Sequence, residues 1–216
     1  MELRTYVLID AMQPQYAALT GVLLQGDVPV EGMAEIFMEL APASDVYEVL
    51  DAALKTTDVR PGLLRVEREY GTLEIHGFFQ ENVRVAGREA LAKFGLSEAD
   101  RWKPEVVSVK TVTGVDPWEA QLVNQASRGG LLLRGQTLCV IEVVPAAYVM
   151  LAANEAEKAS NITLVHYQPA GKFGRLYISG TESAVRVARD AAVTAVNSLP
   201  GAVRTGSGPS SKGGGA

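Results

Sequence analysis

The sequence holds few of the residues that build metal centres or covalent cross-links. It has one cysteine and two histidines among 216 residues, which excludes a disulfide framework within the chain and any cysteine-based zinc site. His76 and His166 are too few for a histidine-rich metal centre, and we expect each to be a strand residue with a local hydrogen bond. Cys139 lies in an apolar segment and is predicted to belong to the core.

Long apolar runs and basic tracts are also missing. No uninterrupted apolar stretch is long enough to cross a bilayer, and the opening MELRTYVLID lacks the apolar segment of a secretory signal. The formal charge is −5, from 20 basic and 25 acidic residues, and this argues against a general nucleic-acid binder, which must neutralise phosphates. The composition favours a soluble, intracellular protein that binds neither membranes nor nucleic acid.

Catalytic patterns are absent too. Gly171, Gly174 and Gly180 lack the spacing of a phosphate-binding loop and do not open a helix. No serine, cysteine or threonine stands in a recognisable arrangement with a base. We therefore predict that the protein is not an enzyme and holds neither a metal nor a cofactor.

What the sequence does contain is an internal repeat. A shift of 103 residues aligns 2–77 with 105–180 without a gap, and sixteen of these 76 positions are identical. Such self-similarity indicates two copies of one domain of typical size. Repeated glycines show that the turns recur together with the core. The identical pairs include Pro14/Pro117, Gly26/Gly129, Gly32/Gly135, Glu39/Glu142, Pro42/Pro145, Lys55/Lys158, Gly71/Gly174 and Gly77/Gly180.

The repeat divides the chain into domains 1–97 and 103–200, joined by a polar link near 96–104. Residues 205–216 are rich in glycine and serine and are predicted to form a flexible tail, although an artificial linker has the same composition. Hydrophobic periodicity and turn residues give each domain the same α+β order of elements. We expect strands over 5–9, 34–40, 59–66 and 71–78, helices from Pro14, after Pro42 and over 81–94, and their counterparts in the second copy at 106–112, 137–143, 162–168, 174–180, Pro117, Pro145 and 182–197.

Particular segments resemble a known family. YVMLAANEAEKASNITLV (148–165), with its echo YEVLDAALKTTDV (47–59), resembles a helix and the following strand of bacterial microcompartment shell proteins. The opening ELRTYVLIDAMQPQYAALTGVLLQGDVPVEG, together with VEREYGTL (66–73) and FGRLYISG (173–180), resembles the gated tandem-domain trimers of carboxysome-type shells. The resemblance extends from residue 2 to about residue 199.

The resemblance implies an architecture and a function. Each copy is a circularly permuted shell domain, an antiparallel sheet with helices, and three chains form a pseudo-hexameric plate with a central gated pore for small metabolites. Two trimers can stack face to face. The plates tile with hexameric and pentameric shell proteins in the shell of a cytoplasmic microcompartment.

The resemblance also assigns roles to particular residues. Glu67 and Arg68 match the pore gate, and Glu69, Ala170, Gly171 and Lys172 belong to the pore loops. Lys55 and Lys158 match the lysine at the tiling edge of the plate. Simpler interpretations stay open, because VERE also suits a solvated hairpin tip, and a lysine late in a helix complements the helix dipole.

A different class of function fits the same repeat. A trimeric regulator built from tandem α+β domains would bind a small molecule at its domain interfaces and would not assemble with shell plates. Fold alone does not decide between the two. Assembly with hexameric shell proteins would distinguish them.

Overall fold

The computed structural model describes residues 1–203 as two antiparallel four-stranded sheets, so the predicted tail at 205–216 lies outside the described residues. Their strand orders are β1-β2-β4-β3 and β5-β6-β8-β7, which are the same arrangement repeated. The elements of the first half are β1 Glu2–Ile9, α1 Pro14–Leu23, β2 Ala34–Ala41, α2 Asp45–Leu54, β3 Arg60–Glu67, β4 Tyr70–Gly77 and α3 Gln80–Ala92. Those that follow are the short η1 Glu98–Asp100, β5 Glu105–Val112, α4 Pro117–Ala126, β6 Thr137–Val144, η2 Ala146–Tyr148, α5 Val149–Ala159, β7 Thr163–Gln168, β8 Gly174–Gly180 and α6 Glu182–Ser198.

Local sequence accounts for most of these elements. Proline stands at the first turn of both α1 and α4, where its missing N–H costs nothing, and Asp116 caps α4 by accepting a hydrogen bond from the Trp118 N–H at 2.8 Å. In α2 the apolar residues Val46 and Val49 are both 0% exposed, whereas Leu54 at the end of the helix is 39% exposed. The predicted strand over 5–9 begins earlier, at Glu2, because β1 pairs with β2 along its whole length.

Backbone geometry repeats with the sequence. Gly32 and Gly135 have φ of 82° and 80°, in the left-handed region that favours glycine. The peptide bonds before Pro42 and Pro145 are both cis. The predicted repeat is therefore present in the turns as well as in the strands.

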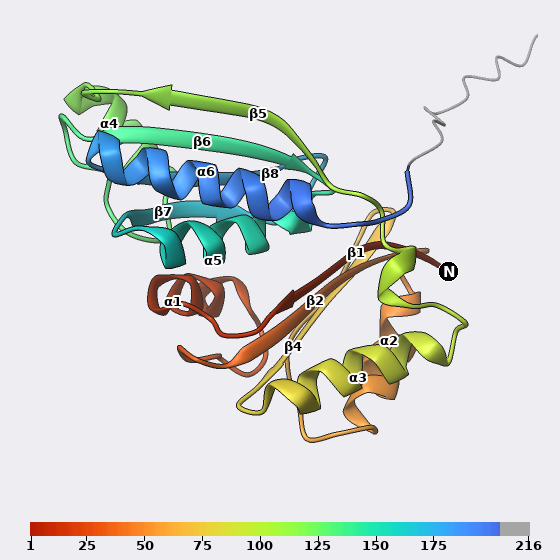
Figure 1. The fold of residues 1–216 in the computed structure, drawn as a ribbon. Coiled ribbons are helices and arrows are strands. Elements are labelled where there is room, and N and C mark those ends of the chain that lie inside the picture. The colour runs from red at the N-terminus through yellow and green to blue at the C-terminus, as the bar shows by residue number, and fades with distance from the viewer. Residues whose placement is uncertain (204–216) are drawn as a thin grey trace, which may run out of the picture.

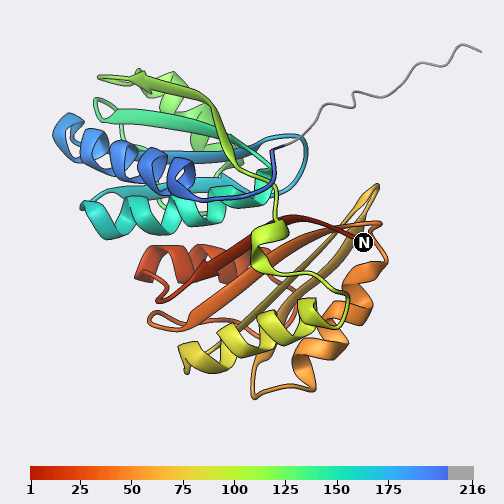
Figure 2. The same cartoon turned by 45° about the vertical axis from the view of Figure 1, so that its right-hand side comes forward.

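Each sheet has a pair of helices on one face and a single helix on the other. In the first domain α2 and α3 cover the face of Ile36, Met38 and Leu73, which form one apolar core. In the second domain α5 and α6 lie together on one face of the sheet, with α4 on the other (Figures 1 and 2). Cys139 is fully buried in the core beneath α5 and α6, which confirms its predicted place.

Helix α1 packs against both domains, because it lies between the first sheet and α5 (Figure 1). Gln13 is a poor N-cap and makes no capping bond, but Glu157 of α5 accepts hydrogen bonds from the N–H groups of Gln15 and Tyr16, both at 2.8 Å. A carboxylate at a helix N-terminus satisfies unpaired donors and complements the helix dipole. The second domain thus provides the cap that the sequence of α1 lacks.

The link between the domains is more buried than its polar sequence suggests. Arg101 is 7% exposed and donates hydrogen bonds to the carbonyls of Pro200 and Tyr6. The N–H of Trp102 bonds the Arg4 carbonyl at 3.2 Å, and the Tyr148 hydroxyl donates to the Trp102 carbonyl at 2.7 Å. The link is therefore held between β1 and the second domain.

Candidate functional site

The hairpin between β3 and β4 carries the predicted gate at its tip. Glu67 ends β3, Arg68 and Glu69 form the turn, and all three are exposed. The equivalent loop between β7 and β8 carries Ala170, Gly171 and Lys172. The two loops come together, because all six predicted pore residues line one cavity of about 610 Å³, with Arg4, Glu39, Arg65, Tyr70, Thr72 and Val144.

The backbone of the first hairpin is strained at the residue assigned to the gate. Arg68 has a φ of 57° and is the one residue other than glycine with positive φ within residues 1–203. Its repeat partner is Gly171, which has a φ of 103°. The turn thus requires a conformation that glycine adopts freely and arginine adopts at a cost of about 1–2 kcal/mol. Such strain is typical of functional sites.

Arg4, at the wall of the same cavity, is a residue that the sequence analysis missed. It is 4% exposed, and its guanidinium forms an ion pair with Glu39. The guanidinium carbon lies 3.5 Å from the centre of the Tyr70 ring and 4.7 Å from that of Trp102. Burial raises the pKa of Glu39, and the Arg4 charge opposes that shift. A signal was available, since Arg4 interrupts an apolar strand segment.

The two predicted edge lysines lie away from this cavity. Lys55 follows the C-terminus of α2, and Lys158 lies in the last turn of α5. Both are exposed and pair along their own helix, Lys55 with Asp51 at 2.7 Å and Lys158 with Glu155 at 3.7 Å. The dipole interpretation and the edge interpretation both suit these positions.

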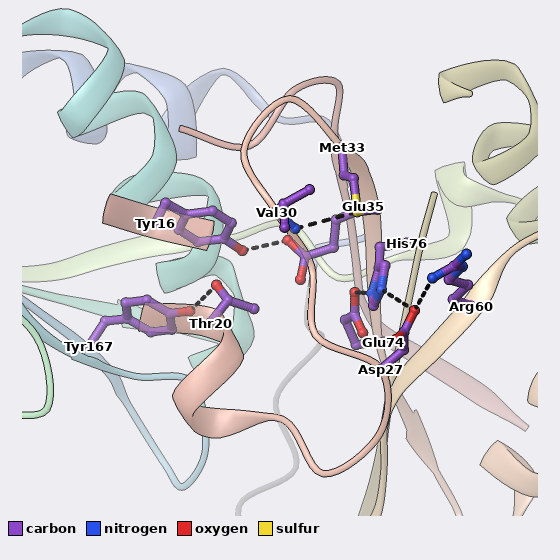
Figure 3. Close-up of polar contacts among 10 residues, drawn as sticks. All are labelled: Tyr16, Thr20, Asp27, Val30, Met33, Glu35, Arg60, Glu74, His76 and Tyr167. Atoms are coloured by element: carbon purple, nitrogen blue, oxygen red, sulfur yellow. Dashed lines mark hydrogen bonds and ion pairs between the residues drawn. The ribbon is translucent and has the colours of Figure 1, made fainter. Parts of the chain in front are cut away.

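A second polar cluster, also missed from the sequence, is buried under α1 (Figure 3). Glu35, Glu74 and His76 are each 0% exposed. The Tyr16 hydroxyl donates to Glu35 at 2.5 Å, and His76 Nδ1 lies 2.9 Å from Glu74 Oε1, which confirms the local hydrogen bond expected of this histidine. At the rim, Asp27 pairs with Arg60 at 3.0 Å and approaches His76 Nε2 at 3.6 Å.

The environment of this cluster disfavours charge. Burial raises the pKa of Glu35 well above its ordinary value, and the neighbouring Glu74 charge adds to that shift. Burial likewise raises the pKa of Glu74 and lowers the pKa of His76. The other histidine, His166, lies in β7 as predicted, but its Nδ1 is buried without a hydrogen-bond partner in the described part of the chain, so its expected local bond is not formed by that nitrogen.

Within residues 1–203, no group of three or more histidine, cysteine, aspartate or glutamate side chains is placed to hold a metal ion. No helix in the same range is long and apolar enough to cross a membrane.

Comparison with known proteins agrees with the duplicated architecture. A family model described as the CsoS1D N-terminal domain matches residues 3–100, and one described as the BMC domain matches residues 137–205. The carboxysome shell protein CcmP of Synechococcus elongatus is 43% identical over 93% of this chain and 94% of its own length. The carboxysome shell protein CsoS1D of Prochlorococcus marinus is 38% identical over 92% of this chain and 78% of its own length.

Solved structures give the same result. The fused permuted hexameric shell protein of the RMM microcompartment is 38% identical, with a TM-score of 0.88 over 92% of this chain and 100% of that one. The double-ringed trimeric shell protein of the same microcompartment is 36% identical, with a TM-score of 0.90 over 94% of this chain and 99% of that one.

These matches define a protein of two tandem, circularly permuted microcompartment shell domains, and the predicted fold class is confirmed. More specifically, the chain belongs to the carboxysome-type shell proteins of bacterial microcompartments. The family is structural, which agrees with the prediction that the protein is not an enzyme.

Proposed function

We propose that three copies of this chain close into a pseudo-hexameric shell plate, and that Glu67 and Arg68 gate a pore for small metabolites at its centre. One observation carries the gate: the six predicted pore residues, drawn from both copies of the repeat, line a single cavity. We keep residues 1–97 and 103–200 as the limits of the two domains. The plate lies in the shell of a microcompartment in the cytoplasm.

The contact between the two domains of one chain supplies the template for the contact between chains. In it, α1 of the first domain packs on α5 and β7 of the second, and we call this contact the seam. Within the seam, Leu19 of α1 is 3% exposed and Met150 of α5 is 1% exposed. Their repeat partners are Leu122 of α4 and Tyr47 of α2, which are 68% and 57% exposed.

Each chain therefore carries the two halves of a second seam, one at each end and both unpaired in the single chain. Joining α4 of one chain to α2 and β3 of the next repeats the first seam, and six domains around a ring correspond to three chains. A head-to-tail contact of this kind closes into a ring when its rotation allows. A relative of 36% identity is described as trimeric, which supports closure at three chains.

Capping at the helix N-termini supports this second seam. In the chain's own seam Glu157 caps α1 by accepting from backbone N–H groups, but the repeat partner of Glu157 is Leu54, whose side chain has no hydrogen-bond acceptor. Helix α4 instead carries its own cap, Asp116. Trp118, which is 75% exposed, replaces Gln15 and suits contact with an apolar Leu54.

At the threefold axis the hairpin charges would meet. Three copies of Glu67 and three of Arg68 surround the axis, and like charges about 4 Å apart repel by roughly 4 kcal/mol at an effective dielectric constant of 20. Pairing Glu67 of one chain with Arg68 of the next offsets that repulsion. Swinging the exposed hairpin tips outward exchanges these pairs for water, so two states of similar free energy are accessible.

Other contacts follow from the same proposal. Lys55 and Lys158 lie on the plate edge, where each lays its aliphatic stem along a neighbouring hexameric or pentameric shell protein and bonds backbone carbonyls. Two plates stack into a double ring, as the description of the 36% identical relative states for that protein.

Electron microscopy of the protein with a hexameric shell partner tests the proposal. We expect trimers set into the partner's lattice with residues 66–70 around the axis. The double variant Glu67→Ala with Arg68→Ala should keep the trimer and lose the closed pore. A closed pore in that variant would refute the gate, and trimers that stay out of the lattice while binding a metabolite saturably would favour the regulator.

A further inference from the structure

The base of the gate hairpin is attached to the rest of the chain through one buried cation. Arg4 in β1 lies between the rings of Tyr70, which directly follows the hairpin turn, and Trp102, which belongs to the link between the domains. Both ring centres lie within the approximately 6 Å at which a cation is attracted to an aromatic face. Water reaches Arg4 poorly, since it is 4% exposed, and its Nε has no hydrogen-bond partner in the described part of the chain.

The link side of this contact is fixed in several directions. Trp102 donates from its indole Nε1 to Glu2 at 2.9 Å and from its backbone N–H to the Arg4 carbonyl at 3.2 Å. Its carbonyl accepts from the Tyr148 hydroxyl, which lies directly before α5. A continuous series of contacts therefore runs from the hairpin through Arg4 and Trp102 into the second domain.

The second copy shows that the fold itself does not require this arrangement. Glu142, the repeat partner of Glu39, is neutralised by Arg175 of β8 at 2.7 Å. At the position of Arg4 the second copy has Val107, which is 45% exposed. In the second copy, Arg175 of β8 thus neutralises Glu142 of the neighbouring β6. In the first copy the residue that neutralises the glutamate is Arg4 of β1, which also contacts the gate hairpin and the link.

We propose that Arg4 is a positioning residue of the gate, holding the pose of the hairpin tip relative to the link by stacking between Tyr70 and Trp102. This rests on the proposed function only where it calls the hairpin a gate. Lysine at this position keeps the charge beside Glu39 but lacks the planar face that stacks on both rings. The hairpin then moves independently of the link.

Hydrogen exchange of the intact trimer tests the positioning. Arg4→Lys should speed exchange of the amides of residues 67–70 by about tenfold, the size expected when a desolvated cation–π contact is lost. Amides of β6 and β8 report global stability and should not change. The matched control is Arg175→Lys, which alters the equivalent pair in the second copy and should leave residues 67–70 unchanged. Equal effects of the two variants, or no effect of Arg4→Lys, would overturn the proposal.

Fluorescence of Trp102 tests the connection to the link. In a Trp118→Phe background, Trp102 is the one remaining tryptophan. Tyr70→Leu should shift its emission when Arg4 is present and should leave it unchanged when position 4 is lysine. The same shift in both backgrounds would show that Tyr70 acts on the link without Arg4 and would contradict the proposal.

The state of the pore separates this inference from the gate itself. Arg4→Lys should change the ratio of open to closed trimers in micrographs by at least about threefold. An unchanged ratio, in a protein whose pore does respond to Glu67→Ala with Arg68→Ala, would remove Arg4 from gating. If the double variant leaves the ratio of open to closed trimers unchanged, the gate assignment fails. Hydrogen exchange and fluorescence then still decide whether Arg4 positions the hairpin.

Discussion

Glu35 and Leu138 occupy the same position in the two copies of the repeat, and both are buried, at 0% and 3% exposure. Glu74 likewise corresponds to Tyr177, and His76 corresponds to Ser179. In the second copy Leu138 and Tyr177 belong to the apolar cluster under α4 and Ser179 carries no charge, so a shell domain folds without buried acids here. Burying ionisable groups costs stability. The first copy therefore carries a cost that depends on pH, located beside the seam.

The carboxyl groups of this cluster set the sign of the pH effect. Because burial raises the folded-state pKa of Glu35 and Glu74, the folded protein holds their protons more tightly than the unfolded chain does. Their stabilising contribution is complete below their ordinary value of 4.5 and is lost as pH rises toward the folded-state pKa. His76 acts oppositely, since its lowered pKa reduces stability only as pH falls below 6.5. Above pH 6.5 His76 no longer contributes to the pH dependence.

We accordingly predict that the carboxyl contribution to the free energy of unfolding is lost as the pH rises above 4.5, and that Glu74→Gln reduces this loss. Denaturant unfolding at a series of pH values measures both slopes. Glu69→Gln, on the exposed hairpin, is the matched control and should keep the wild-type slope. Identical slopes for wild type and Glu74→Gln would show that the buried acid is not responsible.

Strain in the hairpin between β3 and β4 leads to a prediction about stability. Arg68→Gly should raise the free energy of unfolding by up to about 1 kcal/mol, since relief of the positive φ outweighs the conformational entropy that glycine adds to the unfolded chain. Glu69 occupies a turn position without positive φ. Glu69→Gly should therefore lower the free energy of unfolding by about 0.5–1 kcal/mol. Thermal unfolding of both variants measures the difference. A loss of stability in Arg68→Gly would mean that arginine is not strained there.

The proposed ring closes through the two unpaired halves of the seam, α4 of one chain and α2 with β3 of the next. Leu122→Asp places a charge where the repeat predicts an apolar contact, and an unpaired charge should cost at least about 2 kcal/mol at each seam. Sedimentation should show monomers at concentrations where wild type is trimeric. Gln121→Asp is the control, because its repeat partner Ala18 stays exposed within the formed seam. A trimer that tolerates Leu122→Asp would place the contact between chains elsewhere.

The repeat, the strands and the helix starts could be predicted from the sequence because each depends on neighbouring residues. Alternation, proline at the first helical turn and recurring glycines are local signals. Arg4 and the Glu35–Glu74–His76 cluster were not predicted. Their partners come from other strands, from α1 and from the link, and only the strand register brings Glu35 opposite His76. Polar residues within apolar strands indicate that buried polar contacts exist, but they do not identify the partners.

Arg101 and Trp102 illustrate the same limit. Their segment is polar and ends in proline, which indicates a link but not its contacts. The structure holds it through bonds to Pro200, Tyr6 and Tyr148, residues that no local pattern connects. Family resemblance named six pore residues, and the structure places all six around one cavity, while their role at a pore stays a prediction.

The edge lysines give the last prediction. Lys55 and Lys158 are 69% and 62% exposed, and their ion pairs within the helix are worth little, so replacing them should leave folding unchanged. Lys55→Asp with Lys158→Asp should keep the trimer in sedimentation while preventing growth of mixed sheets with a hexameric shell protein in micrographs. Lys93→Asp, an exposed lysine after α3, reverses a charge outside these two positions and should permit assembly. If the double variant assembles as readily as Lys93→Asp, then the two lysines do not form the tiling edge, and their repetition reflects the helix dipole alone.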